Sequence, residues 1–536
     1  MAIDRRGFLG YAAFGSALAL AKPLSAVAQS APSASPELDE ITIGELQDAM
    51  SSGRWTARAI AERYLGRIEA IDKHGPTVNS IIELNPEALA IADAMDRERK
   101  AGHVRGPLHG IPVLIKDNID TADRMATSAG SLALAENHAA RDAFVVSRLR
   151  EAGAVILGKT NLSEWANFRS THSTSGWSGR GGLTKNPYVL DRNACGSSSG
   201  TGSAIAANLA AVGIGTETDG SVVCPSSASG LVGIKPTLGL ISRAGIIPIA
   251  HSQDTSGPMA RTVRDAAILL GILTGADERD PVTVSSRTKG HADYTRFLDA
   301  DGLKGARIGV ARQYFGFNDA TDKLMKDAVA LIKSLGATIV DPSNIATNGK
   351  FDATENDVLQ YEFKTDINKY LANAPASVKS RTLADLIKFN EEHRAEEMPF
   401  FGQEIFEQSE KRGPLSEKKY IAALAKNHRL ARTEGIDATV TKHKVDAIIA
   451  PTGGPVWATD LVNGDHFTGG YSSASAVAGY PHITVPAGMV FGLPVGLSFF
   501  AGAWSEPTLI KFAYAFEQAS KARQKPKFLA TAGLSS

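Results

Sequence analysis

Two serines in glycine-rich turns, with one lysine upstream of them, constrain this sequence more than any other feature. Ser197 lies in the run Gly-Ser-Ser-Ser-Gly-Thr-Gly, and Ser221 ends the run Thr-Glu-Thr-Asp-Gly-Ser. Lys116 directly follows the apolar run Ile-Pro-Val-Leu-Ile. Glycine lets the backbone approach a reacting group closely, and a lysine removed from water can become a neutral base. Together the three residues predict acyl transfer through a covalent serine ester.

Each part of this pattern also has a plainer interpretation. A Gly/Ser run is commonly a flexible loop, and a lysine after an apolar strand is commonly a solvated strand end. However, residues 203–211 after the first turn are small and apolar, which is typical of a buried helix. A glycine turn at a helix N-terminus presents unpaired N–H groups and a positive dipole. The combination therefore favours a catalytic site over a linker.

Other chemistries fit the sequence less well. The run Gly196–Gly200 matches the G-x-S-x-G elbow of α/β-hydrolases, with Ser198 as nucleophile, but residues 191–194 before it are not an apolar strand. A phosphate-binding loop is excluded because no lysine follows the last glycine. The twelve histidines are scattered, without the spacing of metal ligands. The non-enzymatic alternative is an exported solute-binding protein whose glycine turns hold an anion.

Several further motifs accompany the two serine turns and the lysine in a fixed order. They cover residues 161–167, 233–237, 253–261, 446–452 and 483–488. With them the chain resembles the amidase signature family from about residue 41 to about residue 523. The resemblance implies a Ser–cis-Ser–Lys triad.

In that triad, Ser221 is the nucleophile, Lys116 is the base, and Ser197 relays the proton. The resemblance also implies a cis peptide bond between Gly196 and Ser197, which directs the Ser197 hydroxyl toward both partners. We expect Lys116 Nζ, Ser197 Oγ and Ser221 Oγ to form a hydrogen-bonded chain.

The resemblance further implies an oxyanion hole made by the backbone N–H groups of Thr218, Asp219, Gly220 and Ser221. It implies no metal or organic cofactor. Lys116 should have a lowered pKa because the apolar strand around it excludes water.

Within the family, residues 163–169, 175–178 and 217–221 look like those of bacterial peptide amidases. This likeness implies a small-molecule or peptide amide as substrate, with release of ammonia from a C-terminal carboxamide. Aryl and simple aliphatic amides remain open, as does esterase activity.

Three positions depart from the wider family, which usually has Asp, Gly and Arg where this chain has Glu217, Asp219 and Val223. The Asp–Arg pair that is common behind the nucleophile therefore cannot form here.

Strand and helix patterns alternate along the chain, with apolar runs at 112–115 and 154–158 flanking a helical pattern at 143–152. This alternation predicts an α/β fold with parallel strands covered by helices on both faces. The resemblance extends this to the amidase-signature fold over residues 41–530, with a large mixed, mostly parallel central sheet. Residues 344–444 are charged and helical in pattern, and we expect them to form a helical cap.

The N-terminus has the pattern of an export signal. Arg5 and Arg6 precede a mild apolar stretch, and Ala26-Val27-Ala28 is a small-residue cleavage site. We expect residues 1–28 to be a twin-arginine signal peptide and residues 29–40 to be a flexible leader with no core to join. The mature protein should then be periplasmic or secreted, without a membrane anchor.

Composition adds two limits. The formal net charge of the 536 residues is zero, which gives no indication of nucleic-acid binding. The only cysteines are Cys195 and Cys224, each near a candidate catalytic serine. Export permits a disulfide, but the sequence favours two small buried thiols. The oligomeric state is not predicted.

Overall fold

The computed structural model describes residues 36–533. The expected signal peptide, 1–28, lies outside the described residues, so export stays a prediction. Of the expected leader, only residues 36–40 are described, and they differ from the expectation. Pro36–Leu38 forms a short 3-10 helix (η1), and the Leu38 side chain is fully buried in the core. The folded body therefore begins before residue 41, because this leucine has a hydrophobic core to join.

A single large sheet of eleven strands runs through the described part of the chain, in the order β1-β3-β2-β6-β8-β7-β12-β13-β11-β9-β10. A separate two-stranded sheet pairs β4 with β5. The strands are β1 (Ile81–Leu84), β2 (Pro112–Lys116), β3 (Val155–Thr160), β4 (Trp177–Ser178), β5 (Gly182–Leu183), β6 (Val212–Glu217), β7 (Val232–Lys235), β8 (Thr255–Ala260), β9 (Arg307–Val310), β10 (Thr338–Val340), β11 (Ala447–Pro451), β12 (His482–Val490) and β13 (Leu493–Phe500).

The expected α/β class and mixed sheet are confirmed, but the expectation of mostly parallel pairing is wrong. Four neighbouring pairs are parallel, namely β2–β3, β2–β6, β9–β10 and β9–β11. The other six pairs in the large sheet, within residues 36–533, are antiparallel. The strand–helix–strand rule holds for the parallel groups. The rule fails for the strands in the middle of the sheet. There, β12 and β13 are joined by a short turn, and two strands joined in this way must be antiparallel.

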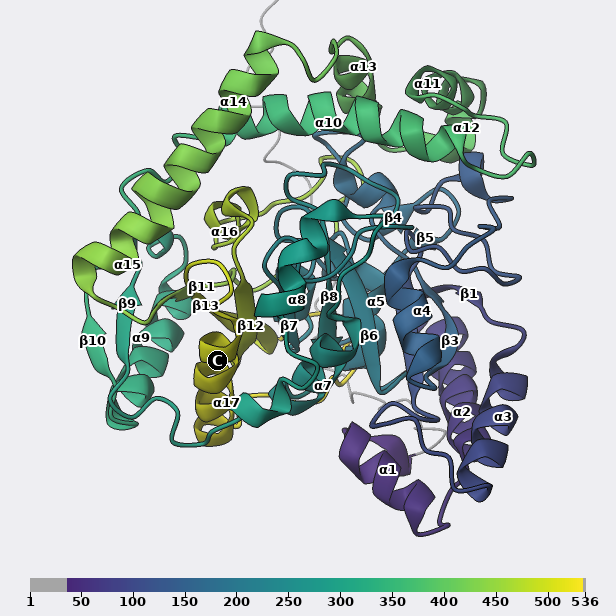
Figure 1. The fold of residues 1–536 in the computed structure, drawn as a ribbon, viewed down its shortest axis with the longest axis horizontal. Coiled ribbons are helices and arrows are strands. Elements are labelled where there is room, and N and C mark those ends of the chain that lie inside the picture. The colour runs from purple at the N-terminus through teal and green to yellow at the C-terminus, as the bar shows by residue number, and fades with distance from the viewer. Residues whose placement is uncertain (1–35, 534–536) are drawn as a thin grey trace, which may run out of the picture.

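Helices surround this sheet (Figure 1). The helices are α1 (Ile43–Ser51), α2 (Ala57–Arg67), α3 (Ala88–Lys100), α4 (Phe144–Glu151), α5 (Ser199–Ala206), α6 (Val223–Ala228), α7 (Val263–Leu273), α8 (Ser286–Lys289), α9 (Asp319–Ser334), α10 (Asp352–Ala372), α11 (Leu383–Glu392), α12 (Arg394–Glu397), α13 (Glu404–Glu410), α14 (Lys418–His428), α15 (Asp437–His443), α16 (Ser473–Ala478) and α17 (Glu506–Ser520). Short 3-10 and π segments are η2 (Ile68–Lys73), η3 (Leu132–Leu134), η4 (Glu164–Asn167), η5 (Pro281–Ser285), η6 (Thr295–Phe297), η7 (Arg312–Tyr314) and η8 (Arg429–Ile436).

The central strands are covered on both faces. Every residue of β2, β3, β6, β8 and β13 is buried. Successive side chains of a strand point to opposite faces, so continuous burial requires packing on each face.

The segment expected to form a cap, 344–444, consists of helices α10 to α15 with η8 and contains no strand. Figure 1 shows α10, α11, α13 and α14 lying together along one side of the molecule, above the sheet. Phe363 of α10 and Phe406 of α13 stack on each other. Their rings contact those of Phe168 and Trp165, respectively, at centroid distances of 5.2 and 5.5 Å. The helical layer therefore packs directly on the turn at residues 165–168. None of the helices in residues 36–533 is long and apolar enough to cross a membrane.

The two cysteines form a disulfide, so the expectation of two free thiols is wrong. The Cα atoms of Cys195 and Cys224 are 6.0 Å apart. They meet because the two serine turns adjoin, as the hydrogen bond of 3.1 Å from the Ser198 N–H to the Ser221 carbonyl shows. Sequence proximity to the serines indicated that the cysteines could approach each other, but only the fold supplies the distance between them.

We predict that the double variant C195S/C224S has a free energy of unfolding about 2–4 kcal/mol lower than that of the wild type, since a cross-link restricts the unfolded chain. Urea denaturation followed by tryptophan fluorescence measures this difference. Wild-type protein in excess reductant is the matched control and should behave like the variant. Two reactive thiols in urea-unfolded wild type without reductant would contradict the disulfide.

Candidate active site

Lys116 is the last residue of β2, in the interior of the sheet. Its side chain is completely buried, and Nζ donates hydrogen bonds to Ser197 Oγ at 2.7 Å and to Thr216 Oγ1 at 2.9 Å. Burial lowers the pKa of the Lys116 ammonium from 10.5 to about 7, against the opposing charges of Glu217 and Asp254. A lysine with this pKa is largely neutral just above pH 7 and can then accept a proton.

Ser197 follows the expected cis peptide bond to Gly196. The position before the serine requires glycine, since a Cβ on Gly196 would lie 2.2 Å from Ser163 Oγ. Helix α5 begins at Ser199, whereas the sequence predicted a helix only after Gly202. The glycines Gly200 and Gly202 are therefore part of the first turn of the helix, and Ser197 lies directly before the N-cap residue, Ser198.

Ser221 lies in the turn between β6 and α6. Gly220 has φ +79°, in the left-handed region that favours glycine. The Glu217 carboxylate accepts hydrogen bonds from the N–H groups of Val222 at 2.8 Å and Val223 at 3.1 Å. The sequence alone shows Glu217 only as a departure from the family pattern and does not indicate that it holds this turn. An acidic residue just before the start of a short helix is the signal that could have indicated it.

The two serine turns are held against each other by main-chain and covalent links. Besides the Ser198–Ser221 hydrogen bond, Ser198 Oγ donates to the Thr216 carbonyl at 3.1 Å. The disulfide adds a third connection. The expected hydrogen bond between Ser197 Oγ and Ser221 Oγ is absent from the described part of the chain, so the chain of three groups is observed only as far as Ser197.

Four consecutive backbone N–H groups precede and include the second serine. Within residues 36–533, the N–H groups of Thr218, Asp219, Gly220 and Ser221 donate no hydrogen bond to another protein group. Buried N–H groups are nearly always paired, so a run of unpaired ones beside a serine is suited to binding an oxygen with negative charge.

Comparison with known proteins agrees with this geometry. The family model "Amidase" matches residues 59–510. The chain belongs to the amidase family. A probable amidase of Arabidopsis thaliana is 43% identical over 500 residues, which cover 92% of each chain.

Solved structures give the same result. The native peptide amidase of Stenotrophomonas maltophilia is 49% identical, with a TM-score of 0.86 over 91% of this chain and 99% of that one. The peptide amidase PAM in complex with the competitive inhibitor chymostatin gives the same identity and coverage with a TM-score of 0.88. The protein is thus a hydrolase that acts on amide bonds.

In this amidase, two cavities lie near the Ser221 turn. One has a volume of about 640 Å³ and is lined by Thr216, Glu217 and Thr218. The other, of about 370 Å³, is lined by Asp352 and Ser472 among other residues. The Ser472 hydroxyl lies 3.3 Å from the position of a Cβ on Gly220. The larger cavity therefore borders the start of the Ser221 turn, whereas the smaller one lies beyond Ser472.

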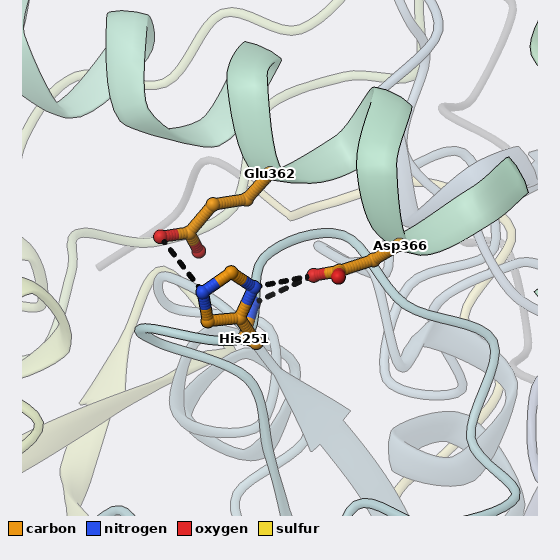
Figure 2. Close-up of side chains that lie close together, drawn as sticks. All are labelled: His251, Glu362 and Asp366. Carbon is orange, nitrogen blue, oxygen red and sulfur yellow. Dashed lines mark hydrogen bonds and ion pairs between the residues drawn. The ribbon is translucent and has the colours of Figure 1, made fainter. Parts of the chain in front are cut away.

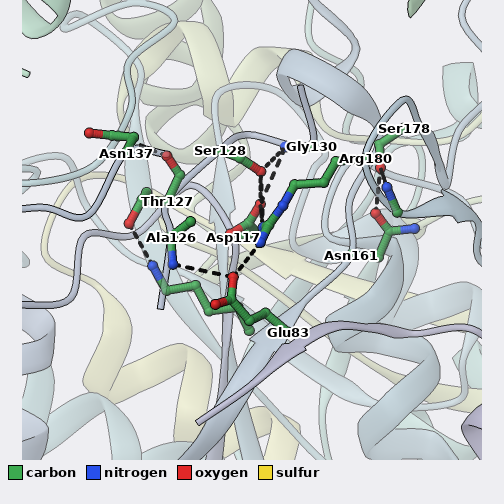
Figure 3. A network of polar contacts seen from close by, with 12 residues as sticks. Glu83, Asp117, Ala126, Thr127, Ser128, Gly130, Asn137, Asn161, Ser178 and Arg180 are labelled. Carbon is green, nitrogen blue, oxygen red and sulfur yellow. Dashed lines mark hydrogen bonds and ion pairs between the residues drawn. The ribbon is translucent and has the colours of Figure 1, made fainter. Parts of the chain in front are cut away.

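A polar network fixes the end of β2 beside the lysine (Figure 3). The Asp117 carbonyl accepts hydrogen bonds from the N–H groups of Ser128 and Ala129, and the Asp117 carboxylate accepts one from the Ser128 hydroxyl. Arg180 contacts the same carboxylate at 3.5 Å and forms an ion pair with Glu83. Lys116 is thus fixed by its neighbour in sequence as well as by its own hydrogen bonds.

Proposed function

We propose that this amidase hydrolyses a carboxamide through an acyl ester on Ser221, with Lys116 and Ser197 moving the proton. The observation that carries the proposal is the buried Lys116 amine, 2.7 Å from Ser197 Oγ and with a pKa of about 7. Ser197 in turn lies in the loop that is hydrogen-bonded and disulfide-linked to the Ser221 turn.

In the proposed mechanism, neutral Lys116 accepts a proton from Ser197, which takes the proton of Ser221. Ser221 Oγ forms a bond to the amide carbon, and the carbonyl π electrons move to oxygen. The proton then returns through Ser197 to the amide nitrogen, so that the C–N bond breaks with release of neutral ammonia or amine. Water hydrolyses the ester by the same route and regenerates Ser221.

The unpaired N–H groups of Thr218 to Ser221 support an oxyanion hole at this position. Donors fixed before the reaction stabilise the negative oxygen without reorganisation, and a single such donor contributes on the order of 3 kcal/mol. The turn is fixed by Glu217, Ser198 and the disulfide.

We infer that the substrate is the C-terminal carboxamide of a peptide or of an amino-acid amide. The 49% identity to peptide amidases over nearly the whole length supports this class. Aryl and aliphatic acylamides are the alternatives within the family.

We predict that Ser221→Ala and Lys116→Ala abolish turnover while the fold is retained. Ser197→Ala should lose less, about 10²–10⁴-fold, because a water molecule can bridge Lys116 and Ser221. Ammonia release measures activity, and circular dichroism confirms folding. A fluorophosphonate probe should label Ser221 in the wild type. Near-full activity of Lys116→Ala at pH 7 would contradict the relay, and labelling of Ser198 would indicate an α/β-hydrolase-type elbow.

A screen of ammonia or amine release across three substrate classes tests the substrate. We predict that peptide amides have a kcat/KM at least about tenfold above that of aryl acylamides and short aliphatic amides; a tenfold ratio corresponds to about 1.4 kcal/mol of transition-state binding. The Ser221→Ala variant is the matched control for background hydrolysis. A higher kcat/KM for an aryl or aliphatic amide would overturn the peptide assignment and leave the mechanism intact.

A further inference from the structure

The loop of residues 249–254 contacts Thr218 at two groups, the side-chain hydroxyl and the backbone carbonyl. The Thr218 hydroxyl donates to Asp254 Oδ1 at 2.6 Å, and the Thr218 carbonyl accepts from Gln253 Nε2 at 3.3 Å. The peptide bond between Thr218 and Asp219 is trans. In a planar trans peptide the carbonyl and the next N–H point in opposite directions. The contact to the Thr218 carbonyl therefore also sets the direction of the Asp219 N–H.

Asp254 also stabilises the conformation of its own loop. Its second carboxylate oxygen, Oδ2, accepts hydrogen bonds of 2.9 Å from the N–H groups of Ile249 and Ala250. Burial raises the pKa of Asp254 to about 6, while these hydrogen bonds and the one from Thr218 lower it. The side chain is therefore a carboxylate at neutral pH that accepts three hydrogen bonds, two from its loop and one from the Ser221 turn.

Helix α10 of the cap holds the loop from the other side (Figure 2). The His251 ring lies between two carboxylates one turn apart on α10, with Nδ1 2.7 Å from Asp366 Oδ2 and Nε2 3.4 Å from Glu362 Oε1. Burial lowers the pKa of His251, but the hydrogen bond to Asp366 and the two negative charges outweigh it and raise that pKa above 6.5. The His251 ring thus links the loop to two carboxylates of α10. Further along α10, Glu355 Oε1 accepts from Gln253 Nε2 at 2.9 Å.

We propose that Asp254 is a positioning residue that orients the N–H groups of the Ser221 turn toward the substrate oxygen. In this arrangement, α10 holds Asp254 in place through loop 249–254. This inference rests on the proposed function, because it assigns those N–H groups to the developing oxyanion. Asp254 acts through Thr218 and does not itself touch the reacting atoms.

The experiment compares a peptide amide as substrate with a peptide aldehyde as probe. The aldehyde carbon forms a bond to Ser221 Oγ, the serine proton passes to Lys116, and the carbonyl oxygen becomes an oxyanion. Asp254→Ala should lower kcat about 10–100-fold with KM almost unchanged, because loss of a complete oxyanion donor costs about 10²–10³-fold and misdirected donors lose part of that. The inhibition constant of the aldehyde should rise by a similar factor.

A buried aspartate outside the site provides the matched control. Asp265 of α7 is buried, its carboxylate accepts a hydrogen bond from the Ile43 N–H at 3.3 Å, and it lines neither of the two cavities near the Ser221 turn. Asp265→Ala should therefore keep the wild-type kcat and aldehyde affinity. All values are compared on the alkaline plateau of the pH profile, since the charge of Asp254 also acts on Lys116.

Two substitutions at Thr218 keep the test decisive if Asp254→Ala fails to fold. Thr218→Val removes only the hydroxyl and should weaken the aldehyde as Asp254→Ala does, whereas Thr218→Ser keeps the hydroxyl and should restore wild-type affinity. Wild-type kcat and aldehyde affinity in Asp254→Ala or Thr218→Val would overturn the inference. Fluorophosphonate labelling of Ser221 in the wild type distinguishes failure of the proposed function from failure of this inference. If Ser221 is not labelled, the proposed function is wrong. If Ser221 is labelled, the kinetic results test only the role of Asp254.

Discussion

The burial of one amine, Lys116 Nζ, against the hydroxyl of Ser197 is the interaction on which the rest of this site depends. A lysine with no exposed surface is costly to keep charged, and its pKa falls to about 7. Glu217 and Asp254 oppose this shift, which prevents the amine from becoming too weak a base. The sheet supplies the desolvation, because β2 lies between β3 and β6 and is buried along its whole length.

Many of the other contacts around the site hold two loops, from different parts of the chain, in fixed positions near that amine. The Ser197 loop is held by the start of α5, and the Ser221 turn by the Glu217 carboxylate. A main-chain hydrogen bond and the Cys195–Cys224 disulfide join the two. The cap does more than cover the sheet, since α10 reaches the Ser221 turn through loop 249–254.

The sequence predicted the parts of this site that depend on local motifs. The positions of Lys116 and Ser197, the cis bond at Gly196 and the helical segment at 344–444 could be inferred from the family resemblance and from residue patterns. Features that depend on contacts between distant segments were missed or wrong. The antiparallel middle of the sheet follows from which strands meet, and the disulfide follows from how two turns pack. The role of Glu217 depends on the direction of two N–H groups, and Leu38 joins a core that local composition does not reveal.

The most direct test of the proposed proton relay is the ionisation of Lys116 in the folded enzyme. Protein labelled with ¹³C at lysine Cε would be titrated by NMR, with the Lys116 resonance assigned by its loss in Lys116→Met. We expect a midpoint at about pH 7 for this resonance, whereas exposed lysines titrate near pH 10.4. A midpoint near that of the exposed lysines would show that Lys116 remains charged at neutral pH. It would contradict the proposed role of Lys116 as the base.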